Sequence, residues 1–89
     1  MNENIIGKRR SRIEIIADIL MHSQNPAKKT HIMYRCSLSF GQLKSYLRLL
    51  RLKALIQRRE NSGTVTYQIT EKGQTFLRKY ISVLRLLQP

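Results

Sequence analysis

The hydrophobic residues near the start of the chain recur at the spacing of a helix. This helix is expected to begin after Ser11, because Glu14 follows at capping-box spacing, in which the hydroxyl and the carboxylate each bind a free amide of the first turn. Pro26, in the run SQNP, ends the helix, since proline biases the residue before it away from helix. The predicted inner face consists of Ile13, Ile16, Ile19 and Leu20.

Two further helices are expected after this break. A short helix spans residues 28–36 and is followed by a polar interruption. The next helix begins at Ser39, because Gln42 completes a second capping box. Leu38 before the cap and Leu43 after it form a hydrophobic staple across the helix start, which makes this boundary doubly specified.

The pattern then changes from helical spacing to alternation, which predicts a β-hairpin. A first strand covers residues 55–59, and the segment ENSG supplies a turn in which Asn61 and Gly63 can adopt positive φ. Residues 64–69 form the second strand, with alternate apolar and polar positions. Its buried face consists of Val65, Tyr67 and Ile69.

A last helix over residues 71–87 is capped by Thr70, with Glu71 at its positive end. The order is therefore helix, helix, helix, hairpin, helix. A helix-turn-helix followed directly by a two-stranded hairpin is a winged helix, so the expected fold is α+β and mainly α. The expected organisation is a flexible basic arm over residues 1–10, a winged-helix domain over 11–70 and a C-terminal helix over 71–89.

The third helix has a polar, cationic face opposite its apolar one. At 100° per residue, the apolar face consists of Phe40, Leu43, Tyr46, Leu47 and Leu50. On the other arc, Gln42 and Ser45 are candidates to read base edges, whereas Lys44 and Arg48 suit either guanine or phosphate. A membrane-surface helix is disfavoured, because the core of the domain claims the apolar face that such a helix must expose. Leu52 is expected past the helix end.

The charge of the chain favours binding to nucleic acid. The chain has 17 Lys and Arg against 5 Asp and Glu, a formal net charge of +12. No acidic residue lies between Asp18 and Glu60, and a field of one sign attracts polyanions, whereas purely solvated surfaces usually mix both signs. The basic residues of this window are Lys28, Lys29, Arg35, Lys44, Arg48, Arg51, Lys53, Arg58 and Arg59.

The hairpin and the N-terminal arm offer further contacts to a nucleic-acid backbone. Wings of this kind lie along phosphates or in the minor groove, where Arg is favoured. The candidate wing residues are Arg58, Arg59, Asn61 and Ser62. The candidate arm residues are Lys8, Arg9, Arg10 and Arg12.

The last helix carries hydrophobic residues at heptad spacing, which predicts a homodimer through this helix. Its first turns are expected to pack on the domain itself, whereas its C-terminal part extends beyond what so small a domain can cover. The predicted seam consists of Leu77, Tyr80, Ile81, Leu84 and Leu87.

Several classes of site are not expected. Cys36 is the only cysteine, which excludes an intramolecular disulfide and favours a reducing compartment. His22 and His31 lie nine residues apart, a spacing that closes no tetrahedral metal site with one cysteine. The chain has no catalytic pair, no phosphate-cradling glycine loop and no set of polar residues for a cofactor or small molecule, so it is not expected to be an enzyme. No stretch suits a signal peptide or membrane span, so a cytoplasmic, nucleoid-associated protein is expected.

The segments RSRIEIIADIL, KKTHIMYRCSLSFGQLKSYLRLL and YQITEKG resemble the archaeal winged-helix DNA-binding proteins, which include small basic chromatin proteins and related predicted transcriptional regulators. The resemblance covers residues 9–84. It implies a winged-helix fold, binding of duplex DNA, a recognition helix over residues 40–51, a wing over 58–64 and dimerisation by an antiparallel coiled coil of C-terminal helices. The last helix is shorter here than in those chromatin proteins, so a shorter helix pair is expected.

The leading hypothesis is a double-stranded DNA-binding protein, either a transcriptional regulator or a chromatin-associated protein. One alternative is a protein-interaction module of the transcription machinery, in which the basic face meets an acidic partner. RNA binding is a second alternative, because attraction to phosphate does not distinguish nucleic acids.

Overall fold

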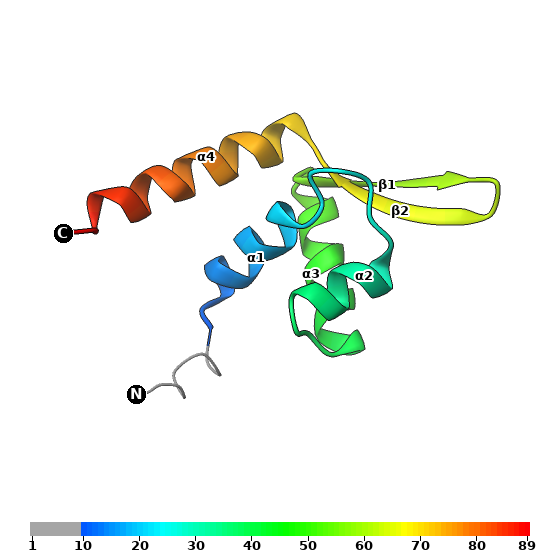
Figure 1. Cartoon of the computed structure of the whole chain (residues 1–89). Coiled ribbons are helices and arrows are strands. Elements are labelled where there is room, and N and C mark those ends of the chain that lie inside the picture. Colours follow the sequence, from blue (N-terminus) through cyan, green and yellow to red (C-terminus); the bar gives the residue numbers. More distant parts are fainter. Residues whose placement is uncertain (1–9) are drawn as a thin grey trace.

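The computed structural model describes residues 10–89, and over this range the chain forms four helices and one antiparallel hairpin (Figure 1). The elements are α1 (Arg12–Met21), α2 (Lys29–Arg35), α3 (Phe40–Leu52), β1 (Ile56–Asn61), β2 (Thr64–Ile69) and α4 (Glu71–Leu86). This order confirms the predicted α+β, mainly α, winged helix-turn-helix fold. Most of the predicted arm, residues 1–9, lies outside the described part of the chain.

Both predicted capping boxes are present. At α1 the Ser11 hydroxyl accepts a hydrogen bond from the Glu14 amide at 3.2 Å, and the Glu14 carboxylate accepts one from the Ser11 amide at 2.8 Å. These hydrogen bonds, led by the one from the Ser11 backbone, lower the pKa of Glu14. At α3 the same reciprocal pair joins Ser39 and Gln42, at 3.1 and 2.9 Å. Each cap stabilises its helix by about 1 kcal/mol and sets where the helix begins.

The hairpin pairs Ile56 with Ile69 at its base and Asn61 with Thr64 at its tip. The two turn residues, Ser62 and Gly63, both have positive φ, as two-residue hairpin turns require. The prediction for Asn61 was therefore wrong, because Asn61 is the last paired residue of β1 and the neighbouring Ser62 adopts the left-handed conformation.

The segment between α1 and α2 is tied to the hairpin. Ala27 and Tyr67 exchange two backbone hydrogen bonds, of 2.9 and 2.8 Å, which form an isolated antiparallel bridge. The bridge holds the segment before α2 beside β2, and so ties the wing to the helix-turn-helix.

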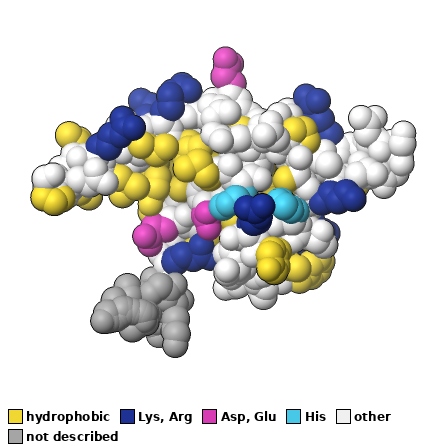
Figure 2. Space-filling view, viewed as in Figure 1, with side chains coloured by type: hydrophobic (Ala, Val, Ile, Leu, Met, Phe, Trp, Pro, Cys, Tyr) yellow, Lys and Arg dark blue, Asp and Glu magenta, His cyan; other side chains and the backbone are white. Residues whose placement is uncertain are grey.

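The first half of α4 packs on the domain, and the second half extends away from it (Figure 1). Gly73 allows the close approach, because a Cβ at this position would lie 2.2 Å from the Leu55 carbonyl oxygen. Figure 2 shows hydrophobic side chains gathered over the part of the molecule that carries the C-terminal half of α4. None of the helices in residues 10–89 is long and apolar enough to cross a bilayer.

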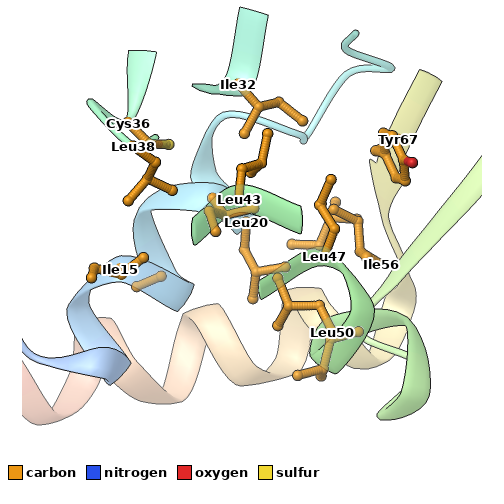
Figure 3. Close-up of a cluster of buried hydrophobic side chains, with 14 of the residues drawn as sticks. Ile15, Leu20, Ile32, Cys36, Leu38, Leu43, Leu47, Leu50, Ile56 and Tyr67 are labelled. Atoms are coloured by element: carbon orange, nitrogen blue, oxygen red, sulfur yellow. The ribbon is translucent and has the colours of Figure 1, made fainter. Parts of the chain in front are cut away.

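The core lies where α1, α2 and α3 meet the hairpin. Leu20, Ile32 and Leu43 come from three different helices, are fully excluded from solvent and point toward one another (Figure 3). Ile56 and Tyr67 close the core on the hairpin side, so the staple and alternation patterns correctly identified its principal members.

On α1 and α3, three predicted positions differ from the observed ones. Ile13 is exposed and Ile15 is buried instead, because α4 packs against α1 and shifts the buried stripe of that helix. Phe40, in the first turn of α3, is 54% exposed, and Lys29 Nζ lies 4.9 Å from its ring centroid. Leu52 is the last residue of α3 rather than a residue beyond it, and it is also exposed.

Candidate nucleic-acid interface

The four residues predicted on the polar face of α3 are all exposed. Lys44, Ser45 and Arg48 lie opposite the buried stripe formed by Leu43 and Leu47. The fourth, Gln42, uses its side-chain oxygen to accept the Ser39 amide. Its side-chain NH₂ remains available as a donor, while one of the two lone pairs of its side-chain oxygen is used by the helix cap.

A groove of about 690 Å³ runs beside α3 and is bordered by α2 and β2. Its lining combines four cations with apolar side chains, and none of the described residues that line it is acidic. The lining residues are Lys29, Phe40, Lys44, Leu47, Arg48, Arg51, Leu52 and Tyr67. The exposed Phe40 and Leu52, the first and last residues of α3, thus both line this basic groove.

Two of these cations were not among the predicted site residues. Arg51 follows Lys44 and Arg48 at intervals of four and three, so its helical spacing was a usable signal. Lys29 comes from α2, and no local pattern places it against α3. Its position follows from the packing of α2 and from the Ala27–Tyr67 bridge.

The wing continues this basic surface on one of its two faces. A second hollow, of about 470 Å³, lies between the start of α2 and the hairpin and is lined by Lys28, Lys29, Thr30, Arg58, Gly63, Thr64, Val65 and Tyr67. Arg58 pairs with Tyr67 and shares its face, whereas Arg59 pairs with Thr66 on the opposite face of the hairpin. The structure therefore brings Arg58, but not Arg59, toward the cations of α2.

The other wing residues are exposed near the tip, where Asn61 ends β1 and Ser62 lies in the turn. Arg58 carries a partial counter-charge, since its guanidinium lies 3.6 Å from the Glu60 carboxylate. This pair is exposed, so it contributes little to stability and can be exchanged for a phosphate.

Arg10 belongs to the domain rather than to a free arm. One of its guanidinium nitrogens donates to Asp18 Oδ2 at 2.8 Å, and another donates to the Cys36 carbonyl. We therefore leave Arg10 out of the candidate interface, because its charge is already partnered. Arg12 is exposed in the first turn of α1, while Lys8 and Arg9 lie outside the described residues.

Arg10 contacts a polar cluster through Asp18, and the spacing of residues in the sequence does not predict this cluster. Donor atoms of Asp18, His22 and Cys36 all lie within 4.8 Å of one another. Cys36 itself is buried, and burial, aided by the negative charge of Asp18, raises the pKa of its thiol to about 12. The cluster lies where the C-terminal ends of α1 and α2 meet, and none of its three residues lines the basic groove.

The predicted seam of α4 divides into two parts. Leu77 is only 4% exposed and packs in the core of its own domain, so its assignment to a dimer seam was wrong. Tyr80 and Ile81 are half-buried against that core. The exposed apolar residues of the C-terminal end are Val83, Leu84, Leu86 and Leu87.

Comparison with solved structures shows where else this arrangement occurs. Sso10a-2, a DNA-binding protein from Sulfolobus solfataricus, superposes with a TM-score of 0.75 at 23% identity, over 88% of this chain and 85% of that one. The transcriptional regulator BldR from the same organism gives a TM-score of 0.75 at 24% identity, over 83% and 56%. A MepR mutant from S. aureus bound to an oligodeoxyribonucleotide gives 0.72 at 17% identity, over 84% and 56%.

The chain thus spans most of Sso10a-2 but little more than half of BldR and of the MepR mutant. No curated protein matches the sequence. The winged helix-turn-helix family model matches residues 9–88, which is nearly the whole chain. On that match, and on the fold just described, this chain belongs to the winged helix-turn-helix family.

Proposed function

We propose that this protein binds double-stranded DNA, as a transcriptional regulator or a chromatin-associated protein. The observation that carries the proposal is the continuous basic surface formed by α3, the start of α2 and one face of the wing. Lys29 and Tyr67 line both of its hollows, so the surface is not interrupted between the helix and the hairpin. A protein with this role is expected in the cytoplasm, associated with the nucleoid.

The dimensions of the surface suit a duplex. A helix of 13 residues is about 20 Å long, and an α-helix fits the major groove, which is about 12 Å wide. With α3 in that groove, Ser45 and Arg48 are the residues best placed to reach base edges. Lys44 and Arg51 then flank them toward phosphates, and Arg58 follows the adjacent backbone or minor groove.

The names of the structural neighbours support the same conclusion. Sso10a-2 is a DNA-binding protein, BldR is a transcriptional regulator, and the MepR mutant was solved bound to an oligodeoxyribonucleotide. The three proteins share the fold of this chain at low sequence identity. The support for DNA binding by this chain comes from its own cationic groove.

We also propose that the protein forms a homodimer through the C-terminal end of α4. Leu84 and Leu87 lie one helical turn apart and are exposed, and each would be buried by the same surface of a second copy. A symmetric dimer presents two copies of α3 to DNA, which favours half-sites spaced by one helical turn or a multiple of it.

Replacement of Lys44 and Arg48 by alanine tests the interface. Loss of two cations that contact DNA is expected to weaken binding of a fluorescent duplex by about 30-fold or more, because each contact contributes about 1–3 kcal/mol and each 1.4 kcal/mol corresponds to about a tenfold change. Fluorescence anisotropy at fixed salt measures the change. The matched control replaces one Lys and one Arg elsewhere, Arg78→Ala with Lys79→Ala on α4, and should bind DNA as the parent does.

Two outcomes would contradict the proposal. Equal binding by the α3 variant and its control would show that the groove is not the DNA contact. No duplex binding by the parent chain would instead favour the protein-interaction module, and tighter binding of a single-stranded or duplex RNA of the same sequence would favour an RNA ligand.

A further inference from the structure

The polar cluster of Asp18, His22 and Cys36 brings together three classes of metal ligand. Asp18 lies on α1, His22 follows one turn later as the C-cap residue of that helix, and Cys36 is the C-cap residue of α2. His22 Nδ1 lies 3.2 Å from Asp18 Oδ1 and 3.7 Å from Cys36 Sγ. A carboxylate oxygen, an imidazole nitrogen and a sulfur therefore converge from the C-terminal ends of two helices, and Cys36 follows His22 by 14 residues in the sequence.

We propose that Asp18, His22 and Cys36 form a binding site for Zn²⁺. A tetrahedral zinc ion holds nitrogen and oxygen ligands at about 2.0 Å and sulfur at about 2.3 Å, which places neighbouring ligand atoms about 3.3–3.6 Å apart. The two short separations, 3.2 and 3.7 Å, lie within about 0.1 Å of this range, and all three ligand atoms lie within 4.8 Å of one another. The arrangement thus needs only small side-chain movements to bind the ion.

The charges and protons of the site are consistent with a divalent ion. Binding converts the Cys36 thiol to a thiolate and releases its proton to solvent, so thiolate and carboxylate together balance the charge of Zn²⁺. His22 coordinates through Nδ1 and keeps its proton on Nε2. The Asp18 carbonyl, which now lies 2.9 Å from Nδ1, retains its hydrogen bond from the His22 backbone amide.

Arg10 and solvent complete the surroundings. Arg10 binds Asp18 Oδ2 and thereby leaves Oδ1 turned toward His22, the role that an outer-shell hydrogen bond has in many metal sites. The side chains of Asp18 and His22 are 29% and 31% exposed, so a water molecule can reach the fourth coordination position. The positive charge of Arg10 opposes the ion, and we expect weaker binding than in an all-cysteine site.

The location of the site gives the ion a structural consequence. Cys36 is followed by Ser37, which has a positive φ, and then by the Leu38–Ser39 pair that starts α3. Zn²⁺ would therefore join the end of α1 to the turn that positions the recognition helix. Occupancy should raise the thermal stability of the domain, because the ion binds the folded arrangement and not the unfolded chain.

Titration of the tag-free, reduced full chain with Co²⁺ tests the site, since cobalt takes the same ligands and reports on them. The parent should show a thiolate-to-cobalt charge-transfer band and strong tetrahedral d–d bands, which Zn²⁺ then bleaches. His22→Gln should abolish the d–d bands, whereas His31→Gln, at the exposed histidine of α2, should match the parent. Cys36→Ser should remove the charge-transfer band.

A thermal measurement keeps the test decisive where a variant at buried Cys36 is unstable. Zn²⁺ should raise the unfolding temperature of the parent and of His31→Gln by several degrees, and should not raise that of His22→Gln or Asp18→Asn. The absence of cobalt bands in the parent would overturn the proposal. So would equal cobalt spectra, or equal thermal shifts, in parent and His22→Gln. None of these outcomes depends on DNA binding.

Discussion

At the scale of single residues, the two helical glycines of the described chain have opposite surroundings. A Cβ on Gly73 would meet the Leu55 carbonyl oxygen at 2.2 Å and an Ile69 side-chain carbon at 2.6 Å, whereas one on Gly41 would meet nothing within 4 Å. We expect Gly73→Ala to lower the free energy of unfolding by about 1–3 kcal/mol through overpacking. Gly41→Ala should raise it by about 0.5–1 kcal/mol, because alanine favours helix.

Chemical denaturation of both variants checks this prediction. A stable Gly73→Ala protein would mean that α4 does not approach the Leu55 backbone as closely as described. Gly41→Ala has a second use, since it adds one methyl group to the proposed DNA face near the start of α3. Both the free energy of unfolding and the affinity for DNA can therefore be measured on the Gly41→Ala variant.

Residue-level patterns predicted local chemistry well and exposure less well. Both capping boxes involve residues three apart, so their hydrogen bonds depend on backbone that the motif itself organises. Ile13 and Phe40 were placed in the core because helical spacing gives a direction but not the extent of the neighbouring elements. Arg10 and Asp18 meet through the fold, and no spacing in the sequence indicates that ion pair.

At the scale of elements, α4 is where pattern and packing diverge. The heptad spacing is continuous from Leu77 to Leu87, yet Leu77 is buried in the domain while Leu87 is 77% exposed. One periodic stripe thus serves two surfaces, the core at its start and a proposed partner at its end. Periodicity cannot locate the change between them, because that depends on where α1 ceases to cover α4.

The dimer proposal predicts the result of charge substitutions at this end. Leu84→Glu with Leu87→Glu should convert a dimer to a monomer while leaving the domain folded, because both side chains are exposed and carry little of its core. Light scattering gives the mass and circular dichroism the helix content. Leu86→Glu, at an exposed leucine outside the predicted seam, is the control and should remain dimeric. A monomeric parent at tens of micromolar would exclude this interface.

At the scale of the whole molecule, the order of elements and the acid-free window were readable from the sequence, and the shape of the interface was not. The predicted α3 residues came from one helix, for which angular position suffices. Lys29, by contrast, lines the groove because of how α2 packs beside α3. The register of the hairpin places Arg58 and Arg59 on opposite faces. Residues from several elements come together only once the chain has folded, and for the same reason the sequence does not predict the cluster of Asp18, His22 and Cys36.

The difference between the two wing arginines yields a prediction about the salt dependence of DNA binding. If about six phosphates are neutralised, log affinity should fall with log salt at a slope near −5. Arg58→Ala should make that slope shallower by about 1, because Arg58 faces the cations of α2 and so lies on the proposed DNA side. Arg59→Ala removes the same charge from the opposite face of the hairpin and should change the slope much less. Anisotropy titrations over a range of salt concentrations measure both variants against the parent. Equal changes would show only a general response to net charge, and a parent slope near −1 would mean that the basic surface does not follow a nucleic-acid backbone at all.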